Sequence, residues 1–161
     1  MPVHVSREGI KHPVTSLQED AKSVLRVLGR SQMELSVVVC DDAFIQDLNR
    51  QWRGKDQPTD VLSFAMTEGG GAHLDPTVLG DVIISVPTAR RQAESMGHPL
   101  AREMRVLLVH GVLHLCGYDH ERPEDAPAMR AKEADVLRAL GEDPVGLVER
   151  ADVAPVSEET S

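Results

Sequence analysis

The stretch from Pro99 to Cys116 constrains the fold more than any other part of the chain, because a helix formed there is apolar on nearly all its sides. Such a helix lies in the core of a domain, since it has no polar face to turn toward solvent. Pro99 suits the first position of a helix, and Gly117 allows the chain to leave the helix through a left-handed residue. The rest of the chain must therefore surround this helix. Its apolar positions are Val106, Leu107, Leu108, Val109, Val112, Leu113 and Leu115.

The other periodic segments predict the class of the fold. Ser16 and Glu19 have the spacing of a capping box, and apolar residues then recur at helical spacing until Gly29. Asp41 or Asp42 is expected to cap the next helix. Strands early and helices late favour a single α+β domain with a mixed sheet of about four strands and five or six helices. The expected strands are 2–6, 33–40, 61–66 and 81–86, and the expected helices are 16–28, 42–52, 88–97, 99–116 and 124–140.

The division of the chain follows from its length and charge. A chain of 161 residues with 41% apolar and 27% charged residues has the size and composition of one globular domain, which excludes a fully disordered, collagenous or coiled-coil chain. The net charge of −9 is uneven, because residues 119–161 carry 12 acidic and five basic side chains. We expect residues 1–141 to form the domain and residues 142–161 to form an acidic, disordered tail.

Composition also limits location and partners. The N-terminus has no apolar segment typical of a signal peptide, and no apolar run approaches the roughly 20 residues that span a bilayer. Cys40 and Cys116 give no disulfide framework, so we expect a cytoplasmic protein that does not associate with membranes. The acidic net charge disfavours sequence-independent binding to nucleic acid. With only four aromatic residues, a nucleic-acid binder built on rows of stacking rings is not expected.

Three histidines form the most informative motif. His110 and His114 are four residues apart and so share one face of the core helix, and the turn after Gly117 delivers His120. Three imidazoles with a fourth position left open are the ligand pattern of catalytic zinc. The alternative is three core histidines that hydrogen-bond locally. Burial of three imidazoles without a shared partner is less favourable, because each unsatisfied buried polar group costs about 1–3 kcal/mol. The spacing therefore predicts one zinc ion per chain.

The same histidine spacing occurs in metzincin proteases, whose motif has glutamate after the first histidine. Gly111 stands at that position here, so the general base of the peptidase mechanism is absent. A zinc site can generate hydroxide without that glutamate, so other hydrolytic chemistry stays open. Asp119 is either an orienting or proton-shuttling group beside the metal or a simple turn residue. Cys116 is expected to be a small core residue, since it lies on the other side of the helix from His114.

A basic turn precedes the third expected strand. Arg50, Arg53 and Lys55 lie at the end of a helix and in the turn after it, and Pro58 stiffens the loop that follows. Cations at a helix C-terminus also stabilise the helix dipole, and Arg50 is explained by that alone. Arg53 and Lys55 flank Gly54, and a rigid basic loop of this kind is suited to binding phosphate.

Three separated motifs combine these features. They read RGKDQPTDVLSF at 53–64, LGDVIIS at 79–85 and HGVLHLCGYDH at 110–120. In this order they resemble the signature of the YbeY family, which are bacterial zinc-dependent endoribonucleases and rRNA maturation factors. The resemblance implies an α+β fold with a metal-binding core helix beneath a cleft. It also implies cleavage of single-stranded RNA, maturation of the 3′ end of small-subunit (16S) ribosomal RNA, and ribosome quality control.

The resemblance also implies roles for particular residues. The three ligands of the family fall on His110, His114 and His120, and its functional arginine falls on Arg53. Lys55 is then expected to bind substrate. Trp52 stands where tyrosine is common in the family and Ala65 where proline is common, and neither is one of these site residues.

The partners implied are single-stranded RNA, ribosomal RNA and proteins of the small subunit or of ribosome assembly, without DNA. Two alternatives stay open. One is a ribosome-assembly factor in which zinc only organises the fold. The other is a zinc hydrolase of a different substrate class, which Gly111 disfavours when the substrate is a peptide.

Overall fold

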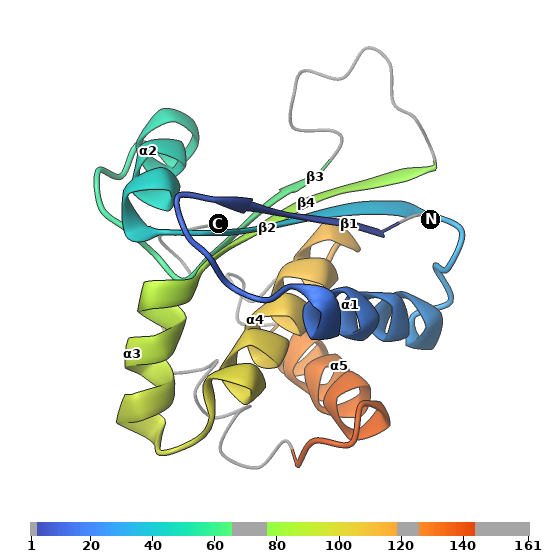
Figure 1. The fold of residues 1–161 in the computed structure, drawn as a ribbon. Coiled ribbons are helices and arrows are strands. Elements are labelled where there is room, and N and C mark those ends of the chain that lie inside the picture. Colours follow the sequence, from blue (N-terminus) through green and yellow to red (C-terminus); the bar gives the residue numbers. More distant parts are fainter. Residues whose placement is uncertain (1–2, 66–76, 119–125, 144–161) are drawn as a thin grey trace.

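A computed structural model describes residues 3–65, 77–118 and 126–143 of the chain. Four strands and five helices lie within these ranges, so the α+β class is confirmed (Figure 1). The strands are β1 (Val3–Glu8), β2 (Glu34–Cys40), β3 (Val61–Ala65) and β4 (Val78–Ser85). The helices are α1 (Thr15–Val27), α2 (Asp42–Arg53), α3 (Val86–Met96), α4 (Leu100–Leu115) and α5 (Ala126–Ala139).

The four strands form one mixed sheet in the order β1-β2-β4-β3. Strands β1, β2 and β4 run parallel, whereas β3 pairs antiparallel to β4 and forms an edge of the sheet. The mixed sheet expected from the sequence is thus confirmed, and the antiparallel strand is the one that follows the basic turn.

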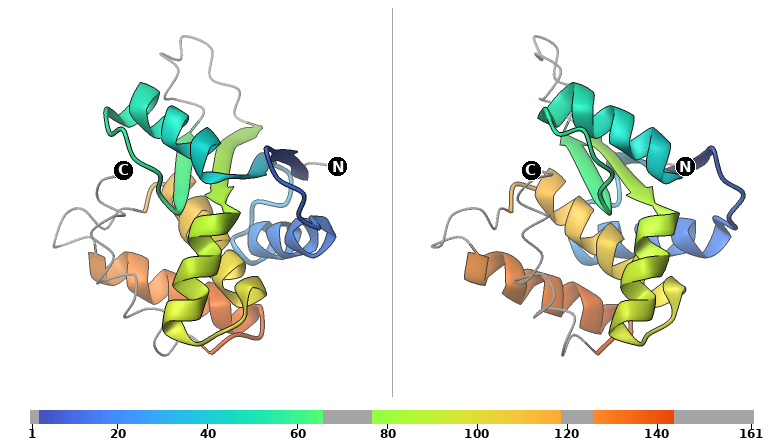
Figure 2. Two further views of the ribbon diagram at one scale, coloured as in Figure 1. Left: turned by 60° about the vertical axis from the view of Figure 1, so that its left-hand side comes forward. Right: turned by 90° about the vertical axis from the view of Figure 1, so that its left-hand side faces the viewer.

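Helices cover the sheet unequally. Helices α1 and α4 lie on one face with α5 packed beneath α4, and α2 lies on the opposite face (Figures 1 and 2). Side chains of β2 alternate between the two sides, since Val37 and Val39 join the large core and Val38 joins the smaller cluster under α2. The face toward α4 is therefore buried in the larger core, whereas the face under α2 is only partly covered.

Helix α4 lies at the centre of this core, as its apolar sequence predicts. Val109, Val112 and Leu113 have no solvent exposure, and α4 contacts α1, α3, α5, β3 and β4. Gly117 follows with a φ of 97°, the left-handed conformation expected at the exit of the helix. No helix within the described ranges has the length and apolarity needed to cross a bilayer.

The helix starts differ from those expected. The predicted capping box at Ser16 is wrong, because α1 begins at Thr15 after Val14 and has no side-chain cap. Asp41 caps α2 as predicted, since its carboxylate accepts a hydrogen bond from the Phe44 backbone N–H at 2.9 Å. Pro99 precedes α4 as its N-cap instead of occupying the first helical position. Packing of α1 against α4 and β1 stabilises its start without a polar cap.

The boundary expected at residue 141 is crossed by polar contacts. Glu142 pairs with Arg105 and Arg102 of α4, and the Asp143 carbonyl accepts a hydrogen bond from Arg102 at 2.8 Å. Residues 144–161 lie outside the described residues. The disorder of the acidic tail stays a prediction.

Candidate metal and phosphate site

His110 is held by a carboxylate from another helix. Its Nδ1 atom lies 2.8 Å from Glu133 Oε2 of α5, and both side chains are more than nine-tenths buried. A neutral His110 that donates from Nδ1 to the Glu133 carboxylate has its lone pair on Nε2. This is the tautomer that a metal ligand needs at Nε2.

His110 Nε2 is directed at the second histidine of α4. It lies 3.2 Å from His114 Nε2, and the two ring centroids are 4.7 Å apart at an interplanar angle of 69°. Two nitrogens that bind one tetrahedral zinc at its usual bond length are about 3.3 Å apart, so the spacing of this pair fits two ligands of one ion. The expected pairing of His110 and His114 on one helix face is thus observed.

The third predicted ligand, His120, lies outside the described residues, as does Asp119. Among the residues that are described, no three His, Cys, Asp or Glu side chains group closely enough to hold a metal. Cys116 packs against the large core, and burial raises the pKa of its thiol while Arg30 opposes the shift. Its placement fits the packing role expected from the sequence.

Arg53 ends α2 and is held against strand β3. Its Nη2 atom donates a hydrogen bond to the Ser63 carbonyl at 2.9 Å, and its Cζ atom lies 4.8 Å from the centroid of the Phe64 ring. Ser63 Oγ in turn donates to the Gly111 carbonyl of α4 at 2.9 Å. Ser63 therefore connects the strand that holds Arg53 to the turn of α4 that carries His110.

The loop after α2 is fixed by hydrogen bonds in addition to Pro58. The buried Asn49 side chain donates to the Gln57 carbonyl at 2.9 Å, and Gln46 donates to the Asp56 carboxylate at 3.0 Å. Lys55 is exposed on this loop, and Arg50 pairs with Asp47 on its own helix. The structure thus places Arg53 beside β3, Lys55 on the neighbouring turn and Arg50 in a local ion pair.

Sequence reasoning missed Glu133 and Ser63. Glu133 carried a usable signal, because it lies four residues after Met129 and four before Leu137 on the buried stripe of α5. A carboxylate on the apolar stripe of a helix needs a partner. Ser63 carried no comparable signal, since alternation along β3 does not reveal which helix its hydroxyl faces.

Gly111 is explained by packing of α4 on the sheet. A Cβ atom there would lie 2.8 Å from Val82 Cγ1 of β4 and 3.1 Å from Ser63 Oγ. Position 111 therefore faces the sheet, and a glutamate at this point of the motif would collide with β4. The absence of the peptidase glutamate follows from the close approach of α4 to the sheet.

We expect Gly111→Ala to destabilise the domain. Overpacking of this kind typically costs about 1–3 kcal/mol, and the higher helix propensity of alanine offsets about 1 kcal/mol of it. Urea unfolding of the variant and the parent measures the change in the free energy of unfolding. Ser95→Ala is the control, because Ser95 is exposed on α3 and alanine there should leave stability unchanged or slightly raised. A Gly111→Ala protein more stable than the parent would contradict the close packing.

Comparison with known proteins gives the family. The sequence model of the family described as Endoribonuclease YbeY matches residues 3–141. The chain belongs to the YbeY family. Endoribonuclease YbeY of Pelotomaculum thermopropionicum is 49% identical over 150 residues, which covers 87% of this chain and 97% of that protein. Endoribonuclease YbeY of Geobacter sulfurreducens is 45% identical over 144 residues, with 87% and 96% covered.

Two further comparisons concern length and fold. Endoribonuclease YbeY of Anaeromyxobacter dehalogenans is 51% identical over 125 residues, and the match covers 63% of that longer YbeY protein. The solution structure of TM1509 from Thermotoga maritima has a TM-score of 0.60 to this chain at 24% identity, over 85% of this chain and 89% of that one. The likeness to TM1509 confirms the fold.

Proposed function

We propose that this YbeY-family chain is a zinc-dependent endoribonuclease that cleaves single-stranded RNA. One observation carries the proposal. The paired imidazoles of His110 and His114 lie on α4. Ser63 of β3 donates a hydrogen bond to the Gly111 carbonyl of the same helix, and the Ser63 carbonyl accepts a hydrogen bond from Arg53. A metal-ligand pair and a phosphate-binding cation connected in this way fit phosphodiester chemistry. The relatives from Pelotomaculum thermopropionicum and Geobacter sulfurreducens are named endoribonucleases, which supports the same reaction class.

The proposed ligands are His110, His114 and His120, with one zinc ion per chain. When bound, zinc supplies a Lewis acid at the reacting phosphate or at water. Glu133 keeps His110 in the tautomer whose Nε2 lone pair faces His114. Arg53 binds the scissile phosphate and stabilises charge that develops on its oxygens. Lys55, exposed on the adjacent turn, contacts a neighbouring phosphate.

The physiological substrate proposed is the precursor of small-subunit (16S) ribosomal RNA, cleaved near its 3′ end, with a further role in ribosome quality control. Small-subunit or assembly proteins are the proposed partners, and the cytoplasm is the proposed location. Membership of the YbeY family and the three motifs at 53–64, 79–85 and 110–120 support this part of the proposal.

An RNA cleavage assay with analysis of the product ends tests the reaction. A 2′,3′-cyclic phosphate indicates attack by the neighbouring 2′-hydroxyl, and a 3′-hydroxyl or a 3′-phosphate without a cyclic precursor indicates attack by water. If purified, zinc-loaded protein cleaves no RNA, the proposed reaction is wrong. Two hypotheses then remain, an assembly factor in which zinc organises the fold and a zinc hydrolase of a different substrate class.

We expect Glu133→Gln to weaken zinc binding by about tenfold to a hundredfold, because loss of a carboxylate behind a ligand histidine has effects of that size. The glutamine retains the volume of the side chain and an acceptor oxygen but removes the charge behind His110. Competition with a chelator of known affinity measures the zinc dissociation constant.

Glu103→Gln is the matched control for that variant. Glu103 is a second buried carboxylate bound to an imidazole, 2.8 Å from His98 Nε2, and lies about two turns before His110 on α4. Its substitution should lower stability without changing zinc affinity by more than about twofold. Equal losses of zinc affinity in both variants would show that Glu133 acts through general stability.

A further inference from the structure

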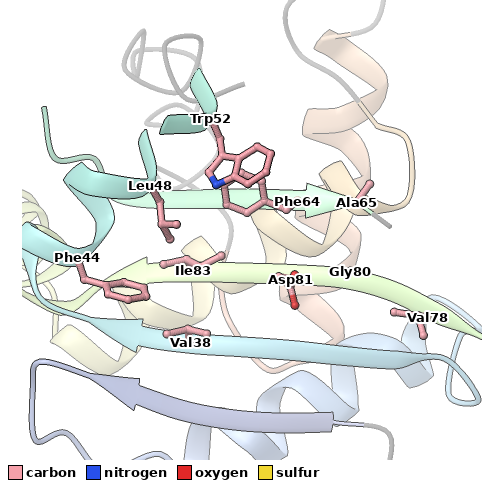
Figure 3. A pocket seen from close by; sticks show the side chains of 10 residues that line it. All are labelled: Val38, Phe44, Leu48, Trp52, Phe64, Ala65, Val78, Gly80, Asp81 and Ile83. Carbon is pink, nitrogen blue, oxygen red and sulfur yellow. The ribbon is translucent and has the colours of Figure 1, made fainter. Parts of the chain in front are cut away.

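A groove lies on the face of the sheet that α2 covers, opposite α4. Its volume is about 540 Å³, within the range of roughly 300–1,000 Å³ typical of sites for small organic molecules. Figure 3 shows it bounded by α2 and the neighbouring strands β3, β4 and β2. Among the ten described residues that line it, Asp81 is the only ionisable one.

Aromatic residues are concentrated in this groove. The chain has four aromatic residues, and three of them, Phe44, Trp52 and Phe64, line it. The fourth, Tyr118, packs against the large core. The chain has too few aromatic residues for an extended stacking surface, but α2 and β3 bring three of them together in one local site.

Trp52 is exposed enough to solvent to contact a ligand. It is 54% exposed, and its ring meets the Phe64 ring edge-on with centroids 6.2 Å apart. Figure 3 shows the indole above Phe64 at the rim of the groove. The Phe64 ring supports the indole of Trp52, and about half of the Trp52 surface is in solvent. The indole therefore offers a face to a planar ligand.

Arg53, the residue of the proposed phosphate site, lies beside the groove and contacts one of its lining residues, Phe64. This arginine follows Trp52 directly in α2, and its guanidinium Cζ lies 4.8 Å from the centroid of the Phe64 ring that lines the groove. The rim is therefore cationic, whereas the lining is apolar apart from one acid. Asp81 is exposed in the groove, and its acidic side chain disfavours phosphate inside it.

We propose that this groove binds an unstacked nucleobase of single-stranded RNA, stacked on Trp52 with Phe64 against its edge, while Arg53 holds the adjoining phosphate. The inference rests on the proposed function, since it takes RNA as the ligand of Arg53. A nucleotide carries a flat, uncharged base and an anionic phosphate on one ribose. This matches an aromatic, apolar groove with a cationic rim. Stacking on aromatic rings with an arginine nearby is the usual basis of single-strand binding without strict sequence preference.

Intrinsic fluorescence reports on this site directly, because Trp52 is the only tryptophan of the chain. The experiment mixes the zinc-loaded full chain with a five-nucleotide single-stranded RNA and, separately, with an abasic strand of the same ribose-phosphate backbone. Emission is recorded in the first second, before turnover accumulates. Quenching by the base-bearing strand and not by the abasic strand is expected. Equal responses to the two strands would overturn the proposal.

Variants separate stacking from charge. Trp52→Leu should raise the dissociation constant of the base-bearing strand about fivefold to a hundredfold, as measured by anisotropy of a labelled strand, and leave that of the abasic strand unchanged. Trp52→Phe should retain most of the affinity. Met96→Ala, which removes an exposed apolar side chain from α3, is the matched control and should bind as the parent does.

The outcomes distinguish this inference from the proposed function. If Trp52→Leu binds the base-bearing strand as tightly as the parent while the parent cleaves RNA and Arg53→Ala does not, the groove inference is wrong and the proposed function stands. The groove would then be a surface for an apolar protein segment. If the parent cleaves no RNA but Trp52→Leu still weakens binding of the base-bearing strand in the anisotropy measurement and leaves binding of the abasic strand unchanged, the nucleobase site stands and the proposed cleavage is wrong.

Discussion

Replacing Arg53 by alanine is expected to lower the rate of single-stranded RNA cleavage by about a hundredfold or more, because a lost charge-stabilising contact in a transition state has effects of that size. Folding and zinc content should be unchanged. Arg53 lies at the end of α2, and its hydrogen bond to the Ser63 carbonyl and its contact with the Phe64 ring both lie outside the large core. Single-turnover cleavage, circular dichroism and zinc analysis on the same preparation measure the three quantities.

Two further substitutions show whether charge or shape matters at this position. Arg53→Lys should restore only part of the rate, because an ammonium keeps the charge but cannot make a planar, bidentate contact with phosphate. Arg50→Ala is the matched control, since Arg50 lies three residues earlier on α2 and pairs with Asp47. A near-parental rate for Arg53→Ala, with contaminating nuclease excluded, would assign the basic turn to docking of ribosomal RNA or protein.

Replacing His114 by alanine should remove most of the bound zinc and with it detectable cleavage. His114 is a better target than His110, because His110→Ala would leave the buried Glu133 carboxylate without its imidazole partner and destabilise the core. His114 is only partly buried, so its removal disturbs packing less. Metal analysis after gel filtration gives the zinc content, and thermal unfolding verifies that the domain is intact.

His4→Ala provides the control for that variant. His4 lies exposed on β1, at the opposite edge of the sheet from β3, so its loss should change neither zinc content nor cleavage. If the folded His114→Ala protein retained a full equivalent of zinc with parental affinity, the ligand assignment would be wrong. The imidazole pair of α4 would then be a local hydrogen-bonded pair.

Segments with one dominant physical signal were predicted correctly from the sequence. Helix α4 was predictable because its apolar residues leave no face for solvent, and strand β2 because its residues alternate before a wholly apolar end. The start of α1 was predicted incorrectly, because contact with α4 and β1 decides it and the Ser16 motif does not. Local sequence motifs contribute less to the position of a helix start than such packing contacts do.

The site was predictable only where its residues are close in sequence. His110 and His114 are one helical turn apart, so spacing alone places them together. Glu133 lies 23 residues beyond His110, and Ser63 lies 48 residues before Gly111. Those contacts depend on how α5 and β3 pack around α4, which no local pattern encodes. The aromatic groove was missed for the same reason, because α2 and β3 supply its rings separately.

The rate of RNA cleavage as a function of zinc occupancy tests the central claim most directly. The parent chain is stripped of zinc by a chelator, reloaded in steps, and assayed on single-stranded RNA at each measured occupancy. We expect cleavage to be absent from the zinc-free chain and to rise in proportion to zinc up to one equivalent per chain. A zinc-free, folded chain that cleaves at the full rate would contradict the account.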